Sequence, residues 1–434
     1  MSMKLWDKNE PIDKLFERFT IGKDKELDLD LAYYDVLGSI GHVKMLNKIS
    51  LLTNEESKLL LKALESIKKQ TLNGSFQIKK GVEDCHSQIE LQLTEKLGDI
   101  GKKVHAGRSR NDQVLTALKL FTKDNLRQVV VRVKTLFELL QEKSEATKNI
   151  LMPGYTHMQV AMPSSFGLWF GAYAESLIDD LTILKAAYQV ANKNPLGSGA
   201  GYGSSFPLDR SYTTTQLGFE SLNHNVVYAQ MTRGKNERTT SFAISSLAAT
   251  LSKFATDICL YAGQDFGFFQ LDLKYTTGSS IMPHKHNPDG FELVRAKCNK
   301  LQSLPQEISL ILANLPTGYH RDLQVLKESF MQAFQWLKDC LDVTIAMTGD
   351  LKVNENLIEE KKYDLIFTVE EVNQLVFDGV PFRDAYGQVA DKVKAGKYIP
   401  TRRIEHTHVG SIGNLANEQI KAAFEKEYSW FELA

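Results

Sequence analysis

Cysteine is scarce in this sequence, and it lacks any closely spaced set of metal ligands. Its four cysteines lie far apart and form no C-x-x-C pair, which argues against a disulfide framework or a zinc site. No H-E-x-x-H, Walker or EF-hand pattern occurs either. The sequence therefore gives no reason to expect a metal ion or an organic cofactor.

Neither sign of charge is in excess, and long apolar runs are missing. The 434 residues carry 52 Lys and Arg against 53 Asp and Glu, for a net charge of −1. Such a balance is not typical of proteins that bind nucleic acid or membrane surfaces. We find no apolar core of a signal peptide and expect no segment that spans a bilayer. The sequence therefore predicts a cytoplasmic protein without nucleic-acid or membrane partners.

Glycine and proline are absent from residues 112–147, where apolar residues recur at helical spacing. A helix of ~35 residues is ~50 Å long and needs packing partners along its whole length. Comparable segments are 164–193, 237–264, 289–313 and 322–349. The sequence therefore predicts an all-α protein with a central bundle of five long helices.

Shorter helices are predicted on both sides of this bundle. Thr53 and Glu56 have the spacing of a capping box, and Asn73-Gly74 would end the helix that they begin. After Gly349 the pattern breaks into shorter pieces. We therefore expect three helical domains, at residues 1–107, 108–350 and 351–434. Some faces, such as residues 166–173, are apolar nearly all round, which favours self-association.

A polar loop over residues 278–289 interrupts the helices. It combines glycine-flanked serines, Lys285 and Asn287 with two prolines, and such a donor-rich loop is more typical of a site than of a linker. Lys285 and Asn287 would stabilise an anion. Ser279 or Ser280 would act as a base only if neighbours lowered its pKa strongly. A surface turn with a chance lysine is the alternative.

This loop resembles the GSSxMPxKxNP signature of the fumarase/aspartase superfamily. The run HAGRSRNDQV at residues 105–114 is similar to HTGRSRNDQV of argininosuccinate lyases, with Ala106 in place of Thr. It puts Ser109, Arg110 and Asn111 at the start of a predicted helix, and Arg suits planar recognition of carboxylates. A charged first turn capped by Asp112 is the alternative, although a helix N-terminus disfavours arginines.

Three further stretches resemble the same family. Residues 152–163 resemble PGYTHxQxAxP and contain Thr156 and His157; residues 194–207 resemble a glycine-rich loop of the family. Residues 314–327 match NLPxxYxxDLQxxK. The resemblance extends from Lys4 to about Arg383. The positions that it identifies as substrate-binding are Ser39, His86, Ser109, Arg110, Asn111, Thr156, Asn287, Tyr319, Gln324 and Lys327. For Gln324 and Lys327, a solvated helix face is the alternative.

The resemblance implies reversible cleavage of argininosuccinate to arginine and fumarate by a homotetramer with a twenty-helix core. Ser279 would remove the proton, and Lys285 would stabilise the aci-carboxylate intermediate. His157 would protonate the leaving guanidino nitrogen, and Glu292 occupies the place of the carboxylate that keeps this His charged. The expected partners are a small-molecule substrate and copies of the chain.

Two other functions stay open. The chain could cleave adenylosuccinate or another succinyl adduct, or it could be a silent structural protein, since lyases of this fold have been recruited as lens crystallins. It also departs from the family: His284 and His286 flank Lys285, and residues 231–238 replace an acidic S-D-R-D run. We assign no role to Arg233 or Arg238.

Overall fold

The computed structural model describes residues 13–433, and Lys4, where the resemblance begins, lies outside them. The all-α prediction is confirmed. The α-helices are α1 (Lys14–Ile21), α2 (Asp24–Lys48), α3 (Asn54–Leu72), α4 (Cys85–Leu97), α5 (Asp99–Lys102), α6 (Arg110–Ala146), α7 (Phe166–Ala191), α8 (Arg210–Gln216), α9 (Val226–Tyr261), α10 (Asp289–Leu301), α11 (Leu304–Leu312), α12 (Leu326–Gly349), α13 (Thr368–Phe377), α14 (Phe382–Lys394) and α15 (Asn417–Leu433). The strands are β1 (Leu151–Thr156), β2 (Gln159–Ser165), β3 (Lys193–Asn194), β4 (Ser221–Leu222), β5 (Phe269–Gln270) and β6 (Lys352–Val353).

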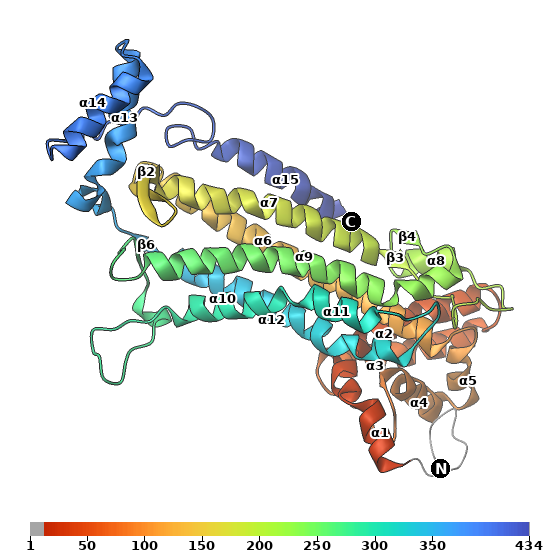
Figure 1. The fold of residues 1–434 in the computed structure, drawn as a ribbon. Helices are drawn as coiled ribbons and strands as arrows, with labels where there is room; N and C mark the ends of the chain where they lie inside the picture. Colours follow the sequence, from red (N-terminus) through yellow and green to blue (C-terminus); the bar gives the residue numbers. More distant parts are fainter. Residues whose placement is uncertain (1–12, 434) are drawn as a thin grey trace.

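The long helices run side by side through the middle of the molecule (Figure 1). Helix α6 has 37 residues, which corresponds to ~55 Å, and it packs against α7, α9 and α12. Its apolar face, with Leu118, Val133 and Leu140, belongs to the main hydrophobic core. The predicted bundle is therefore confirmed, and packing along the whole of α6 explains why so long a helix is stable.

Two members of the bundle are interrupted. The single helix predicted over 289–313 is wrong, because α10 ends at Leu301 and α11 begins at Leu304 with Pro305 in its first turn. Proline has no N–H and clashes with the preceding turn of a continuous helix. Helix α9 starts at Val226 rather than at residue 237 and is kinked at Arg233 and Gly234, whose φ is +81°.

An antiparallel hairpin, β1–β2, lies between α6 and α7, and the sequence did not predict these strands. Its register pairs Pro153 with Pro163 and Thr156 with Gln159. His157 and Met158 form the tip, and both have positive φ, 52° and 59°. The hairpin stands at the end of the bundle away from helices α2–α5 (Figure 1).

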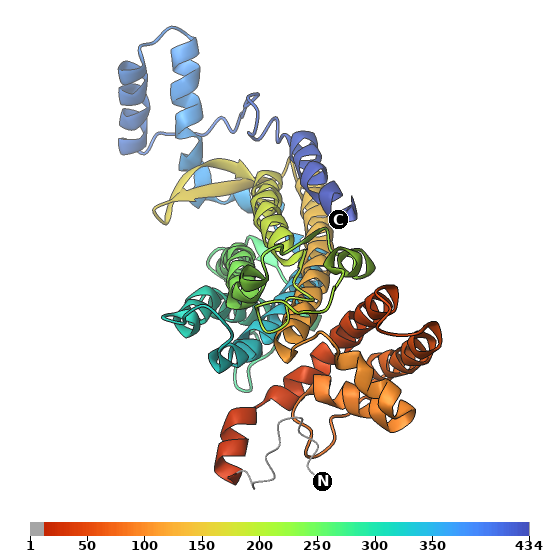
Figure 2. The same ribbon diagram turned by 90° about the vertical axis from the view of Figure 1, so that its right-hand side faces the viewer.

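The two ends of the chain pack differently. Helices α2, α3 and α4 share a separate core that includes Val36, Leu46 and Leu64. Helices α13 and α14 form a pair that projects beyond the hairpin (Figure 2). The chain then returns, and α15 packs on the bundle, where the rings of Phe424 and Phe137 stack at 3.8 Å. The division into three domains stays a prediction.

Helix α9 is long and apolar enough to cross a membrane by length and composition alone, with a mean hydropathy of 1.2 over its most apolar window. This finding differs from the expectation, drawn from the sequence, that no segment of the chain is long and apolar enough to span a bilayer. Half of that window is buried inside this chain, and Leu247, Leu251 and Ile258 belong to the main core. The same composition is typical of a helix at the centre of a bundle.

Candidate functional site

A cleft of about 310 Å³ lies where the starts of α2, α4, α6 and α12 and the kink of α9 meet. Six of the predicted substrate-binding residues line it. The lining residues are Asp24, Asp28, Glu83, Asp84, His86, Arg110, Asn111, Val114, Arg233, Tyr319, Arg321, Gln324 and Lys327. Four carboxylates and four permanent cations thus face one cleft, which suits a ligand that carries charges of both signs.

Lys327 lies deep in this cleft, on the first turn of α12. Its Nζ is 2.7 Å from Asp24 Oδ1 and 2.8 Å from Asp28 Oδ1. Burial works to lower the pKa of Lys327, but the two carboxylates outweigh burial and raise it above its ordinary value. Lys327 therefore stays charged, and the solvated helix face considered for it is wrong.

His86 is also buried, beside a carboxylate. Its Nδ1 is 2.9 Å from Asp35 Oδ1, and Asp35 raises the pKa of His86 although burial opposes this. Its Nε2 is buried and has no hydrogen-bond partner within residues 13–433. In the protonated ring this nitrogen can donate one more hydrogen bond, which suits the predicted role in binding a substrate carboxylate.

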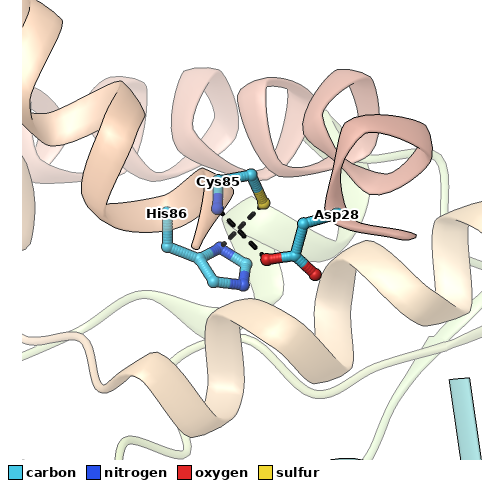
Figure 3. A group of neighbouring side chains, drawn as sticks. All are labelled: Asp28, Cys85 and His86. Carbon is cyan, nitrogen blue, oxygen red and sulfur yellow. Dashed lines mark hydrogen bonds between the residues drawn. The ribbon is translucent and has the colours of Figure 1, made fainter. Parts of the chain in front are cut away.

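His86, Cys85 and Asp28 come close enough to share a metal ion (Figure 3). Their chemistry argues against one. Asp28 already accepts from the Cys85 N–H at 3.1 Å and from Lys327, and the ammonium of Lys327 would repel a cation. Burial raises the pKa of the Cys85 thiol, whereas a metal needs a thiolate and a neutral imidazole. The cluster is better described as a hydrogen-bonded part of the cleft wall than as a metal site.

Arg110 is held in place by several partners at the start of α6. It lies 3.1 Å from Glu83 Oε2 and from Asp84 Oδ2 and donates to Ser87 Oγ at 3.1 Å. The residue before it, Ser109, caps the helix in a capping box with Asp112. The buried carboxylate of Asp112 also accepts the N–H groups of Gly197 and Gly199, both at 2.9 Å. Ser109 thus caps the helix, and its role in substrate binding stays a prediction. The glycine-rich loop is hydrogen-bonded to the helix that carries Arg110.

Ser39 lies beside the cleft rather than in its lining. It is fully buried in α2, and its Oγ accepts from Arg108 Nη1 at 2.8 Å. Gln324 and Tyr319 do line the cleft. Gln324 donates one amide N–H to the carbonyl oxygen of Thr20 at 2.8 Å, and its second N–H and its amide oxygen stay available to a substrate.

Two cations of the cleft, Arg233 and Arg321, were assigned no role from the sequence. The buried Arg233 sits at the kink of α9, where its Nε is 3.0 Å from Glu237 Oε1 and its Nη2 donates to Leu323 O at 2.7 Å. Glu237 also accepts from the N–H of Gly234 at 2.7 Å. In the sequence, the pair Arg233-Gly234 ahead of Glu237 was the only indication of this arrangement. It could not identify a site residue, because Arg233 reaches the cleft only through the break in the helix at Gly234.

The other predicted residues lie in the 278–289 loop and in the hairpin. Ser279 Oγ accepts two backbone N–H groups, from Met282 at 3.1 Å and Ile281 at 3.3 Å. The base of the loop is closed by Asn287 N donating to Thr277 O at 2.9 Å, while Lys285 is exposed. Two donors aimed at one hydroxyl oxygen favour negative charge there, as a base at Ser279 requires.

Thr156 and His157 are exposed at the hairpin tip, and Glu292 is exposed on the first turn of α10. Among the described residues of one chain, no hydrogen bond or ion pair joins His157 to Glu292, whose charged neighbour is Arg295 at 3.9 Å. The pairing of His157 with Glu292 therefore stays a prediction.

One chain holds these two groups of residues at opposite ends of the bundle. Arg110 begins α6 and the hairpin follows its last turn, so a helix of ~55 Å separates Arg110 from His157. Lys327 begins α12, whereas Gly290, next to the 278–289 loop, packs against Met347 near the end of α12. Within one chain the lining of the cleft therefore lacks Ser279, Lys285 and His157.

The chain was compared with known proteins. A family profile described as "Lyase" matches residues 7–302. The argininosuccinate lyase of Parabacteroides distasonis is 60% identical over 97% of this chain and 95% of its own length. Those of Bacteroides fragilis (58%, covering 100% and 97%) and Thermotoga neapolitana (41%, covering 90% and 98%) are also similar.

Among solved structures, EDDS lyase in complex with formate superposes with a TM-score of 0.76 at 21% identity, covering 98% of this chain and 91% of the other. Class II fumarase from Schistosoma mansoni superposes with a TM-score of 0.71 at 16% identity, covering 95% of each chain. At these identities the two structures support the fold. The relatives similar over nearly their full length carry the assignment: this chain is a lyase that belongs to the argininosuccinate lyase family.

Proposed function

We propose that this chain cleaves argininosuccinate reversibly into arginine and fumarate. The observation that carries the proposal is the cleft of four carboxylates and four cations around Arg110 and Lys327, on a chain 60% identical to an argininosuccinate lyase. Argininosuccinate carries three carboxylates, an ammonium and a guanidinium. Adenylosuccinate would instead need room for a purine, and Tyr319 is the one aromatic side chain in this lining.

Ser279 is the proposed base. The proton to be removed sits on a carbon beside a carboxylate, so its removal builds up charge on that carboxylate. The two N–H groups that face Ser279 Oγ favour its alkoxide form. Lys285 and Asn287 belong to the same loop, and they stabilise the aci-carboxylate as it forms.

His157 is the proposed acid for the leaving guanidino nitrogen. It is exposed at the tip of the hairpin and therefore free to meet another chain, as is Glu292. Once a carboxylate lies against it, His157 is held charged and oriented. Protonation of the leaving group contributes roughly 10²–10⁴-fold to the rate.

The site is completed by neighbouring chains in a homotetramer. Large apolar side chains stay exposed on the central helices, which is unusual for a monomer. These exposed side chains are Val131, Phe242, Leu293, Leu310 and Val343. Covering them with other copies of the bundle brings the loop and hairpin of one chain to the cleft of another. The assembly works in the cytoplasm on a small-molecule substrate.

The test is to mix purified protein with argininosuccinate or with adenylosuccinate and to follow fumarate by its absorbance. Fumarate from the first adduct alone supports the proposal. Release from adenylosuccinate alone would assign the chain to the alternative reaction, and no release from either adduct would leave it as a silent relative.

A further inference from the structure

The tip of the β1–β2 hairpin is a two-residue turn whose backbone is left-handed at both positions. Thr156 pairs with Gln159 across the strands, which leaves His157 and Met158 as the loop. Their φ angles are 52° and 59°. Hairpin loops of this kind match the right-handed twist of the flanking strands, and they strongly favour Asn-Gly. This chain has His-Met there instead.

Met158 is the unfavourable residue of this turn. Histidine is several-fold enriched among the non-glycine residues with positive φ. Methionine has no such preference, and in this conformation its Cβ comes close to the following carbonyl oxygen. Packing within the chain does not compensate, because Met158 is 65% exposed. The pairing of the two strands therefore imposes the conformation of Met158.

The strands that impose this turn are anchored to the bundle. Met152, near the start of β1, is buried in the main core. The N–H of Phe166, which follows β2, donates to Ile150 O at 3.0 Å. Nearer the tip, the ring of Tyr155 lies 5.6 Å from that of Phe266. His157 therefore stands at the end of an arm that is fixed at its base, and the turn decides the direction in which its side chain leaves the arm.

Backbone strain persists where the surrounding structure imposes it, and it clusters at sites that need a fixed geometry. We propose that Met158 is a positioning residue, whose left-handed backbone orients the imidazole of His157 toward the leaving guanidino nitrogen in the cleft of a neighbouring chain. The inference rests on the proposed function, in which His157 is the acid. Met158 occupies a position that the motif PGYTHxQxAxP leaves open, so the resemblance assigns it no role.

Three substitutions separate the backbone of Met158 from its side chain. Glycine and asparagine tolerate positive φ, so Met158→Gly and Met158→Asn keep the turn and lose the apolar side chain. Valine is β-branched and resists this conformation, so Met158→Val keeps an apolar side chain and opposes the turn. We expect the first two variants to keep at least about a third of the wild-type kcat. Met158→Val should lower kcat at least about tenfold, because its acid is misplaced, with the KM of argininosuccinate within about twofold.

Met162→Val is the matched control. It makes the same exchange at an exposed position of β2, where the backbone is extended and suits valine. We expect it to leave kcat unchanged. Equal losses in the glycine, asparagine and valine variants of Met158 would overturn the inference, because they would assign the role to the side chain rather than to the turn.

A double-mutant cycle tests whether Met158 acts through His157. In a His157→Gln background, Met158→Val should cost less than about twofold in kcat, because the group that it misplaces is gone. An equal loss in both backgrounds would overturn the inference. If Met158→Val does not assemble, Met158→Ala takes its place, since its Cβ also opposes a left-handed backbone. A wild-type protein that releases no fumarate from argininosuccinate, or a fully active His157→Gln variant, would instead refute the proposed function or the proposed acid.

Discussion

At the scale of single residues, the loop serine can be tested most directly. Ser279 Oγ accepts two backbone N–H groups, whereas its exposed neighbour Ser280 has no side-chain hydrogen bond within the described chain. We expect Ser279→Ala to lower kcat by at least about 10³-fold, since it removes the proposed base, without a change in thermal unfolding. Ser280→Ala is the control. Turnover near the wild-type rate in Ser279→Ala would refute the assignment of the base.

His86 predicts a dependence of stability on pH. Asp35 raises the pKa of His86 above its ordinary value in the folded protein, so the folded state holds this proton more tightly than the unfolded state. The stability contributed by the pair is fully present below the unfolded pKa of about 6.5. It is lost as pH rises through the higher folded pKa. In denaturant titrations, the difference in free energy of unfolding between wild type and His86→Gln should therefore shrink as pH rises. A difference in free energy of unfolding that stays constant with pH would contradict this role of the pair of His86 and Asp35.

At the scale of elements, the kink of α9 depends on one glycine. Gly234 has φ +81°, and a Cβ there would lie 2.2 Å from Leu312 Cδ2. We expect Gly234→Ala to lower the free energy of unfolding by about 1–3 kcal/mol and to raise KM, because Arg233 is aimed at the cleft by this kink. Gly349→Ala, where a Cβ meets nothing within 4 Å, is the control. Equal stability of the two variants would show that the kink is not strained.

Helices and strands could be predicted from the sequence where the residues that determine them are close together in the chain. The capping box of Thr53 and Glu56 forms as the sequence predicts, because cap and helix lie within one turn. The break at Pro305 was also visible in the sequence but was missed. The hairpin and the kink were not predictable, because strand pairing and the packing around Gly234 decide them. Arg321 was missed for a similar reason, since its partner Glu83 is 238 residues away in the chain.

At the scale of the whole molecule, the structure of one chain explains why the site could be predicted only in parts. The motifs identified Arg110, Lys327, His157 and Ser279, but motifs carry no information on which copies of a chain meet. In this chain a helix of ~55 Å keeps Arg110 from His157. The sequence thus predicts which residues form the site, and we propose that assembly of several chains brings them together.

A site shared between chains predicts that two inactive variants rescue each other. Ser279→Ala has an intact cleft, and Arg110→Met has an intact loop. In mixed tetramers formed by co-expression, about a quarter of the sites should combine an intact cleft with an intact loop. We expect kcat per site to recover to about that fraction of the wild-type value, measured by fumarate release from doubly tagged, purified tetramers. Each variant alone is the control. Mixed tetramers as inactive as their parents would show that cleft and loop act within one chain, which would require the bundle to bring its two ends together.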